Sequence, residues 1–226
     1  MFFPDDFDTP EEPLPRAAGP RLFFRLLGQE TVALLLLNVI FLLSCIPVLT
    51  IPPAVLALWR VIRRVLTNRG IHAWQHYREA FRQTWKQGYA AFALTGLPLL
   101  LAGYGAWFYL RLAETNFLCY LPFLFCSTVF LTALLTSPYL YGLLAAGRPL
   151  NRETALLSLK LGLGKPLRAI LAAVGWHGAL AAAILLLPLS GLWLLMAGIS
   201  VPCLLAQFLI RTVLERFAPE ESDTFC

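Results

Sequence analysis

The stretch from Asn38 to Arg64, NVIFLLSCIPVLTIPPAVLALWRVIRR, decides the fold of this chain. An apolar run enters a proline-rich break and leaves it as a helix with a basic edge. Proline has no N–H and its ring clashes with the carbonyl four residues back, so Pro47, Pro52 and Pro53 interrupt a regular helix. A membrane protein tolerates such a break at bilayer depth when neighbouring helices satisfy the freed backbone groups. The stretch therefore predicts a membrane protein whose chain turns or kinks here.

The composition agrees with a membrane protein and excludes several other classes. The 226 residues are 58% hydrophobic and 14% charged, with a mean hydropathy of +0.69, which leaves too little polar surface for a soluble globule. The five cysteines form no CxxC pair, so we expect neither a disulfide framework nor a zinc site. The net charge of +5 comes from Lys and Arg that lie beside apolar runs, as the positive-inside rule predicts for a membrane protein. No basic stretch lies away from the apolar runs, so the charge does not indicate nucleic-acid binding.

Apolar runs of membrane-spanning length predict an all-α fold, a polytopic transmembrane bundle of helical hairpins. A helix needs about 20 residues to cross a hydrocarbon core of roughly 30 Å. Four runs meet that length plainly: 90–110, 117–146, 169–187 and 192–210. Short connections pair them into two hairpins, and internal prolines predict kinks in them (Pro98, Pro122, Pro138 and Pro202).

The first apolar region, 32–59, is long enough for one crossing and short for two. If the helical stretch begins at Pro20 and runs to Leu66, two crossings fit, provided that the second is short. A single crossing places four of the 18 basic residues outside, whereas a hairpin places only Arg111 there. The count favours the hairpin or a re-entrant form of it, and five crossings remain the alternative to six.

The predicted transmembrane domain spans 20–217, between an acidic, Pro-rich N-terminal segment at 1–19 and a short tail at 218–226. The N-terminal segment lacks a basic start followed by an apolar core, so it does not resemble a cleavable signal peptide. Two linkers, Ala73 to Gly88 and Asn151 to Gly164, predict short cytoplasmic amphipathic helices that end in glycine before the next span.

The first linker predicts an interfacial helix. Aromatic residues recur at helical spacing on one face and basic residues on another. The residues are Trp74, Tyr77, Phe81 and Trp85 on the aromatic face, and Arg78, Arg82 and Lys86 on the basic face.

Three groups of residues within the apolar segments are candidate functional positions. The first is the helix-break motif, formed by Asn38, Pro47, Thr50, Pro52 and Pro53. The second comprises His177 and Gln207, since ionisable or polar groups in a bilayer are costly and often functional. No acidic residue lies within an apolar span, so an interhelical hydrogen bond is favoured over a proton relay for the histidine. The third is the stripe Thr128, Thr132 and Thr136, where helix packing is favoured over a permeation path.

No pattern predicts a catalytic, cofactor-binding or metal-binding residue. His72, His76 and Glu79 share a spacing that can hold a metal, but the HExxH protease pattern is absent, and a solvated helix face is the favoured interpretation. The GLGKP stretch lacks the full phosphate-loop pattern, and Pro166 occupies the place of its Ser or Thr. We therefore do not predict an enzyme.

Three motifs resemble one family of bacterial membrane proteins. The stretch LLLLNVIFLLSCIPVLTIPPAVLALWRVIRRVL is similar to the signature of the YesL-like (DUF624) family, usually close to LNLLWLLCCLPVVTIGPATAALY. The start MFFPDDFDTP resembles the family's F-N-P-D opening, and FRQTWKQG, Phe81 to Gly88, resembles its F-x-x-N-F-K-Q helix. Here IPP replaces the usual IGP. The resemblance implies a bacterial cytoplasmic-membrane protein linked to carbohydrate ABC transporters, whose genes commonly accompany this family.

Two functional hypotheses follow from these observations. The favoured one is a non-enzymatic accessory or regulatory protein that docks on membrane subunits of a carbohydrate ABC-type uptake system. The alternative is a small transporter or channel in its own right, since broken helices at bilayer depth often mark transport sites. Both predict the lipid bilayer as a partner, and neither requires a cofactor or nucleic acid.

Overall fold

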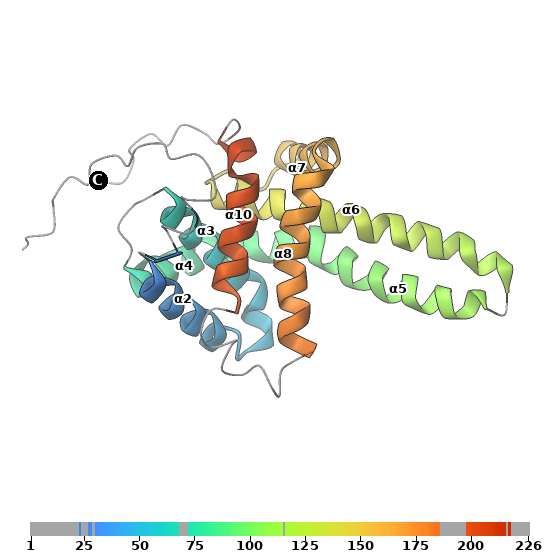
Figure 1. Cartoon of the computed structure of the whole chain (residues 1–226), viewed down its shortest axis with the longest axis horizontal. Helices are drawn as coiled ribbons and strands as arrows, with labels where there is room; N and C mark the ends of the chain where they lie inside the picture. Colours follow the sequence, from blue (N-terminus) through green and yellow to red (C-terminus); the bar gives the residue numbers. More distant parts are fainter. Residues whose placement is uncertain are drawn as a thin grey trace, which may run out of the picture.

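The structure, a computed structural model, describes Phe23, Leu27, Gly28, residues 30–67, 72–114, 116–185, 198–215 and residue 217. The predicted N-terminal segment at 1–19 and the tail at 218–226 lie outside these residues, as do 186–197. The described residues form helices and connecting turns and contain no strand, so the predicted all-α fold is confirmed (Figure 1).

The helices alternate with short 3-10 and π segments. In chain order they are α2 (Thr31–Ser44), the 3-10 turn η1 (Val48–Thr50), α3 (Ile51–Leu66), α4 (Ala73–Ala91), the π segment η2 (Phe92–Gly96), α5 (Leu97–Ala113), the 3-10 turn η3 (Phe117–Cys119), α6 (Tyr120–Ala145), α7 (Arg152–Gly164), α8 (Pro166–Leu185) and α10 (Ser200–Leu214).

Helix α3 is the centre of the fold. Its two prolines stand in the first turn, where a missing N–H costs no helix hydrogen bond. The apolar residues that follow are buried against α4, α6 and α10, and the Trp59 side chain is fully enclosed. The predicted interruption of the first apolar region is confirmed, because α2 ends at Ser44 and α3 begins at Ile51.

The predicted boundary between the first linker helix and the next span is wrong. Helix α4 does not end at Gly88, because α4, η2 and α5 form one helix from Ala73 to Ala113. Pro98 cannot donate to the carbonyl four residues earlier, and the π segment immediately before it widens the helix at that point. The chain therefore accommodates this proline within a continuous helix.

The inner prolines have different effects at different positions. Pro122 and Pro202 lie in the first turns of α6 and α10, where proline is tolerated, so the kinks predicted for them are not needed. Pro138 alone lies inside α6. The span predicted at 192–210 is helical from Ser200, and the part before residue 198 lies outside the described residues.

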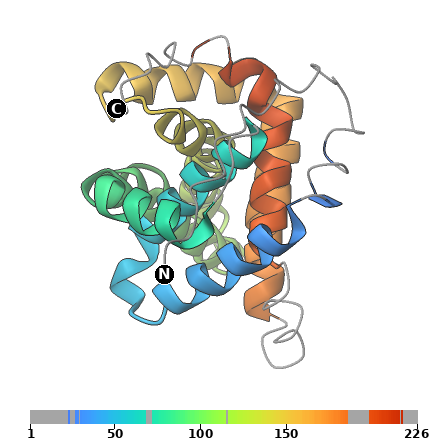
Figure 2. The same cartoon turned by 90° about the vertical axis from the view of Figure 1, so that its left-hand side faces the viewer.

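The antiparallel helices α5 and α6 form a long projection from the rest of the molecule. We call residues 97–131 the arm and the remaining helices the body. In Figure 1 the arm extends to the right, while α8 and α10 lie side by side in the body. Figure 2 shows α7 lying crosswise at one end of α8 and α10. The second half of α6 returns into the body, where its side chains are buried.

Two helices among the described residues are long and apolar enough to cross a membrane, Ala73–Ala113 and Phe117–Ala145. Only 17% and 11% of their most apolar windows are buried, whereas the core helix of a soluble protein would be mostly buried. Apolar helices with exposed surfaces need a lipid or protein environment. The two exposed apolar helices therefore support the predicted membrane location.

Candidate functional site

Hydrogen bonds from side chains hold the helix break in one conformation. The Thr50 hydroxyl lies within hydrogen-bond distance of the Ser44 carbonyl at the end of α2, and 2.6 Å from the Pro47 carbonyl, which also accepts from the backbone N–H of Thr50 at 2.9 Å. From α4, the Tyr89 hydroxyl donates to the Leu49 carbonyl at 2.6 Å. The break is thus a built turn, because its exposed carbonyls have specific donors.

A second contact from α4 fixes the start of α3. A Cβ atom placed on Gly88 would lie 2.6 Å from the Cα atom of Pro53 and 3.0 Å from the Pro52 carbonyl oxygen. Only glycine permits this approach of the two backbones. The glycine that the sequence suggested as a helix end therefore serves as a packing surface for the break motif.

Two buried amides of the candidate residues connect distant helices. The side-chain oxygen of Asn38, Oδ1, accepts a hydrogen bond from the backbone N–H of Ile199 at 3.2 Å, which joins α2 to the start of α10. The Gln207 side-chain amide donates to the Trp59 carbonyl at 2.6 Å, which joins α10 to α3. Both amides are buried, so each one fixes the position of a helix with respect to the break.

His177 has a partner that the sequence did not reveal. Its Nε2 atom lies 3.3 Å from the Ser137 hydroxyl on α6, and its Nδ1 lies 3.1 Å from the Ala173 carbonyl. A carbonyl only accepts, so Nδ1 carries the proton and Nε2 of the neutral ring accepts from serine. The predicted interhelical hydrogen bond of this histidine is confirmed.

The same serine compensates for the proline that follows it. Pro138 has no N–H, which leaves the Leu134 carbonyl without its helix donor. The Ser137 hydroxyl lies 3.1 Å from that carbonyl oxygen, so its single proton can be donated either to Leu134 or to His177. The Ser-Pro pair at 137–138 is a sequence signal for this compensation within α6, but it does not point to His177.

A cavity of 170 Å³ lies between the break and this polar pair. Its lining residues include Pro52 from α3, Leu99 from α5, Ser137 from α6, and Trp176 and His177 from α8. Trp176 packs edge-on against Trp59, with ring centroids 5.7 Å apart. Pro52 of the break motif, the histidine and its serine therefore share one largely apolar cavity, whose wall also includes the hydroxyl-bearing residues Thr95 and Tyr141.

Gln207 and Asn38 do not line this cavity. The structure therefore separates the predicted polar residues into two kinds: His177 borders the cavity, whereas the two amides are buried connections between helices.

The predicted interfacial helix has a buried face made of small residues. Ala73, Ala80, Thr84, Gly88 and Ala91 pack toward the body along α4. The aromatic residues lie beside this face: Tyr77 is buried, Phe81 is partly buried, and Trp74 and Trp85 are exposed. The basic residues Arg78, Arg82 and Lys86 are exposed.

Tyr77 connects α4 to the end of α2. The Ser44 hydroxyl donates to the Phe41 carbonyl at 2.7 Å, so the Tyr77 hydroxyl, 2.6 Å from Ser44 Oγ, is the donor in their contact. Burial raises the pKa of Tyr77 well above its usual range, and the phenol remains a neutral donor.

The threonine stripe faces a groove of 440 Å³ between α5, α6 and α7. Thr128, Thr132 and Thr136 each donate to the carbonyl four residues earlier, at 2.7–2.8 Å. Hydroxyls engaged in their own helix present methyl groups to their neighbours. The stripe is thus an apolar packing surface with its hydrogen bonds already satisfied.

Comparison with known proteins gives one match. Residues 34–105 match the family model described as "Protein of unknown function, DUF624". No curated protein and no solved structure matches the chain. The matched residues include the helix break, all of α4 and the start of α5, which are the segments with the built turn and the Gly88 contact. The predicted resemblance to the YesL-like (DUF624) proteins is therefore confirmed over residues 34–105, whereas the opening MFFPDDFDTP lies outside the match.

Proposed function

We propose that this chain is a non-enzymatic, multi-pass protein of the bacterial cytoplasmic membrane that acts as an accessory or regulatory subunit of a carbohydrate ABC-type uptake system. In this proposal the arm lies in the bilayer, where it contacts a membrane subunit of the transporter. The body holds the arm in position and places α4 and α7 at the cytoplasmic surface.

The exposed apolar surface of the arm is the observation that carries the proposal. Leu121 and Phe125 on α6 are each 71% exposed, and Tyr104 on α5 is 66% exposed. Aromatic and aliphatic side chains of this size are rarely left in contiguous exposed patches unless lipid or another protein covers them. Within the described part of the chain, the arm presents this surface on two helices.

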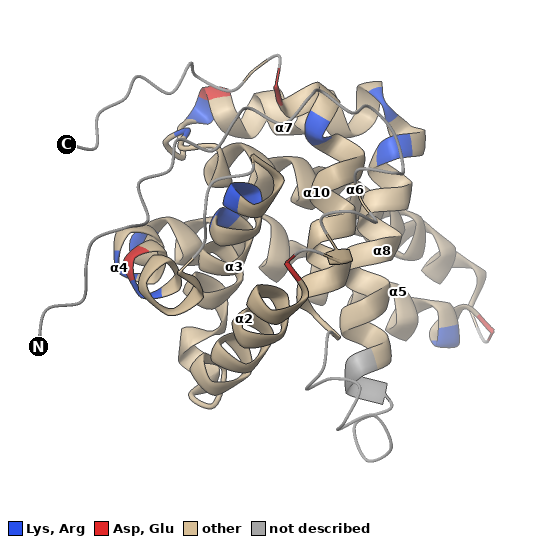
Figure 3. Ribbon diagram, turned by 60° about the vertical axis from the view of Figure 1, so that its left-hand side comes forward, with Lys and Arg blue, Asp and Glu red and all other residues tan. Residues whose placement is uncertain are grey.

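The distribution of charge supports the proposed orientation. Figure 3 shows Lys and Arg gathered along α4, at the end of α3 and around α7 and the start of α8. At the far end of the arm, Arg111 is the basic residue of the last turn of α5. Basic residues concentrate on the cytoplasmic side of membrane proteins. The body end with α4 and α7 is therefore the cytoplasmic end in this proposal, and the tip of the arm is external.

In-cell photo-crosslinking tests the proposed docking. A benzophenone amino acid replaces Phe125 on the arm in one variant and Trp74 on α4, which is 57% exposed, in the matched control. The proposal predicts that the Phe125 position crosslinks to a membrane subunit of a carbohydrate importer and that the Trp74 position does not. Deletion of the gene should also lower uptake of the sugar which that importer carries. If arm positions yield only lipid adducts and uptake of every tested sugar is unchanged, the accessory role is wrong.

The cavity beside the break favours a transporter as the second candidate. It adjoins both the broken helix and the His177–Ser137 pair, an arrangement similar to sites formed by discontinuous helices in transporters. Flux through the purified chain in liposomes, without any partner, would favour this candidate over the accessory role. A Ser137→Ala variant should then reduce flux, while Ser127→Ala, the same change elsewhere on α6, should leave it intact.

A further inference from the structure

Three arginines of α3 meet residues of α4 around a small polar pocket. Arg60, Arg63 and Arg64 follow one another at steps of three and one, which places them on one side of the helix. All three are partly buried and line a pocket of 90 Å³. The pocket lies near the C-terminal end of α3, where the partial negative charge of the helix favours cations.

Gln83 of α4 orients one of these arginines. Its side-chain oxygen accepts a hydrogen bond from Nη1 of Arg60 at 3.2 Å, and its Nε2 donates to the Glu79 carboxylate at 3.0 Å. Glu79 is the one acidic residue among the described residues that line the pocket. Among the described residues that line the pocket, three thus carry a guanidinium group and one carries a carboxylate.

His76 adds a neutral donor to the pocket wall. The backbone N–H of His72 donates to Nδ1 of His76 at 3.1 Å, so the proton of the neutral ring is on Nε2. Partial burial, with the nearby Arg64 and His72, lowers the pKa of His76, while Glu79 opposes this shift. At neutral pH the ring is therefore uncharged and has an N–H available for a hydrogen bond.

We propose that this pocket binds a phosphate group, as a monoester or a diester. Guanidinium groups match phosphate oxygens in pairs of hydrogen bonds, and partial burial strengthens each contact relative to water. The pocket volume suits one phosphate group and excludes a nucleotide base from the same space. Two sources supply this chemistry, the headgroup of an anionic phospholipid and a small phosphorylated metabolite. The proposal is independent of any transporter partner.

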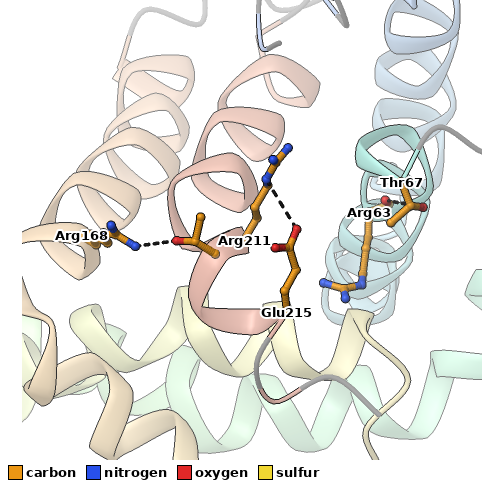
Figure 4. Close-up of polar contacts among 6 residues, drawn as sticks. Arg63, Thr67, Arg168, Arg211 and Glu215 are labelled. Atoms are coloured by element: carbon orange, nitrogen blue, oxygen red, sulfur yellow. Dashed lines mark hydrogen bonds and ion pairs between the residues drawn. The ribbon is translucent and has the colours of Figure 1, made fainter. Parts of the chain in front are cut away.

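Figure 4 shows Arg63 of the pocket together with nearby residues of α8 and α10. The Thr67 hydroxyl donates to the Arg63 carbonyl at 3.2 Å and closes the end of α3. Beside it, at the end of α10, Arg211 Nε lies 3.6 Å from Glu215, and Arg168 of α8 donates to Thr212. Arg168 and Arg211 thus have polar partners on α10 and do not line the pocket, which Arg63 and Arg64 do.

Two binding measurements on the purified full chain distinguish the sources. Glycerol 3-phosphate is titrated by calorimetry into the chain in lipid-free detergent, and bound phosphatidylglycerol is counted by native mass spectrometry against phosphatidylcholine. Saturable binding of the first probe identifies a soluble ligand, and selective retention of phosphatidylglycerol identifies a lipid. The variant Arg64→Gln should weaken the binding that is seen about tenfold, the scale of one charge-assisted hydrogen bond. The matched control Arg82→Gln, exposed on α4 and outside the pocket, should change it less than twofold.

A second pair of variants tests the site without removing an arginine from α3. Gln83→Glu places a carboxylate beside Arg60 and should weaken binding at least as much as Arg64→Gln. Gln75→Glu makes the same charge change at an exposed position of α4, two turns away, and should leave binding unchanged. Equal losses in Gln83→Glu and Gln75→Glu, or the absence of binding of both probes to the unaltered chain, would overturn the proposal.

Discussion

Gln207 on α10 donates a hydrogen bond to the backbone carbonyl of Trp59 on α3, and both residues are buried. The carbonyl lies about two turns before the end of α3, next to the first arginine of the phosphate pocket. A single side-chain amide therefore connects the last described helix of the chain to its central helix.

Replacing Gln207 by Leu should destabilise the fold by about 1 kcal/mol, the typical scale of a polar contact between helices in a membrane. The side chains are similar in size, so the loss reports the hydrogen bond more than the packing. Thermal unfolding of the purified chain in detergent measures it. Gln75→Leu makes the same change at an exposed position of α4 and should leave the unfolding temperature unchanged; equal effects would show that the contact contributes nothing.

Gly88→Ala should destabilise the fold by about 1–3 kcal/mol, because the added methyl group would overlap backbone atoms of Pro53. Backbone atoms cannot move aside as the end of a flexible side chain can. Gly164→Ala is the control, since a Cβ atom at Gly164 meets nothing within 4 Å. Thermal unfolding of both variants gives the comparison. An unfolding temperature of Gly88→Ala at or above that of Gly164→Ala would contradict the close contact between α3 and α4.

Ser137→Ala should cost about 1 kcal/mol, because it removes the hydroxyl that lies near both the Leu134 carbonyl and His177. The same substitution at Ser127, also on α6, serves as the control. The unfolding free energy in denaturant measures both. An equal cost in the two variants would remove the special role of Ser137, because the gain in helix propensity from serine to alanine is common to both positions.

Cysteine labelling tests the proposed orientation. In a cysteine-free background, Asn116→Cys at the tip of the arm should react with an impermeant maleimide on intact cells, and Gln75→Cys on α4 should react only after permeabilisation. The reason is that basic residues near α4 favour the cytoplasmic side. The reverse pattern would invert the proposed orientation.

Much of the fold follows from local properties of the sequence. Long apolar runs predict helices, and proline has the same chemistry in any context, so the break between Ser44 and Ile51 is predictable. The helix at 152–164 also lies where its sequence predicts, because Gly164 and Pro166 are local signals that end a helix.

Contacts between distant residues explain what the sequence could not reveal. Gly88 has the appearance of a helix end when read alone, but its role depends on Pro53, 35 positions earlier, which packs against it. Similarly, His177 and Ser137 are 40 residues apart, and nothing in either local sequence identifies the other as its partner. The arginines of α3 are conspicuous as a charged edge, but the pocket exists only once α4 folds back along them.

The continuous helix from Ala73 to Ala113 joins the arm to the phosphate pocket as a single rod. At a rise of 1.5 Å per residue, its 41 residues extend for about 60 Å. A tilt of the arm, whether imposed by membrane thickness or by a neighbouring protein, is transmitted to α4 unless the π segment at 92–96 bends to absorb it. The pocket residues contributed by α4 would then shift relative to the arginines of α3. The affinity of the pocket for phosphate would therefore depend on the tilt of the arm, and so on the membrane or protein around it.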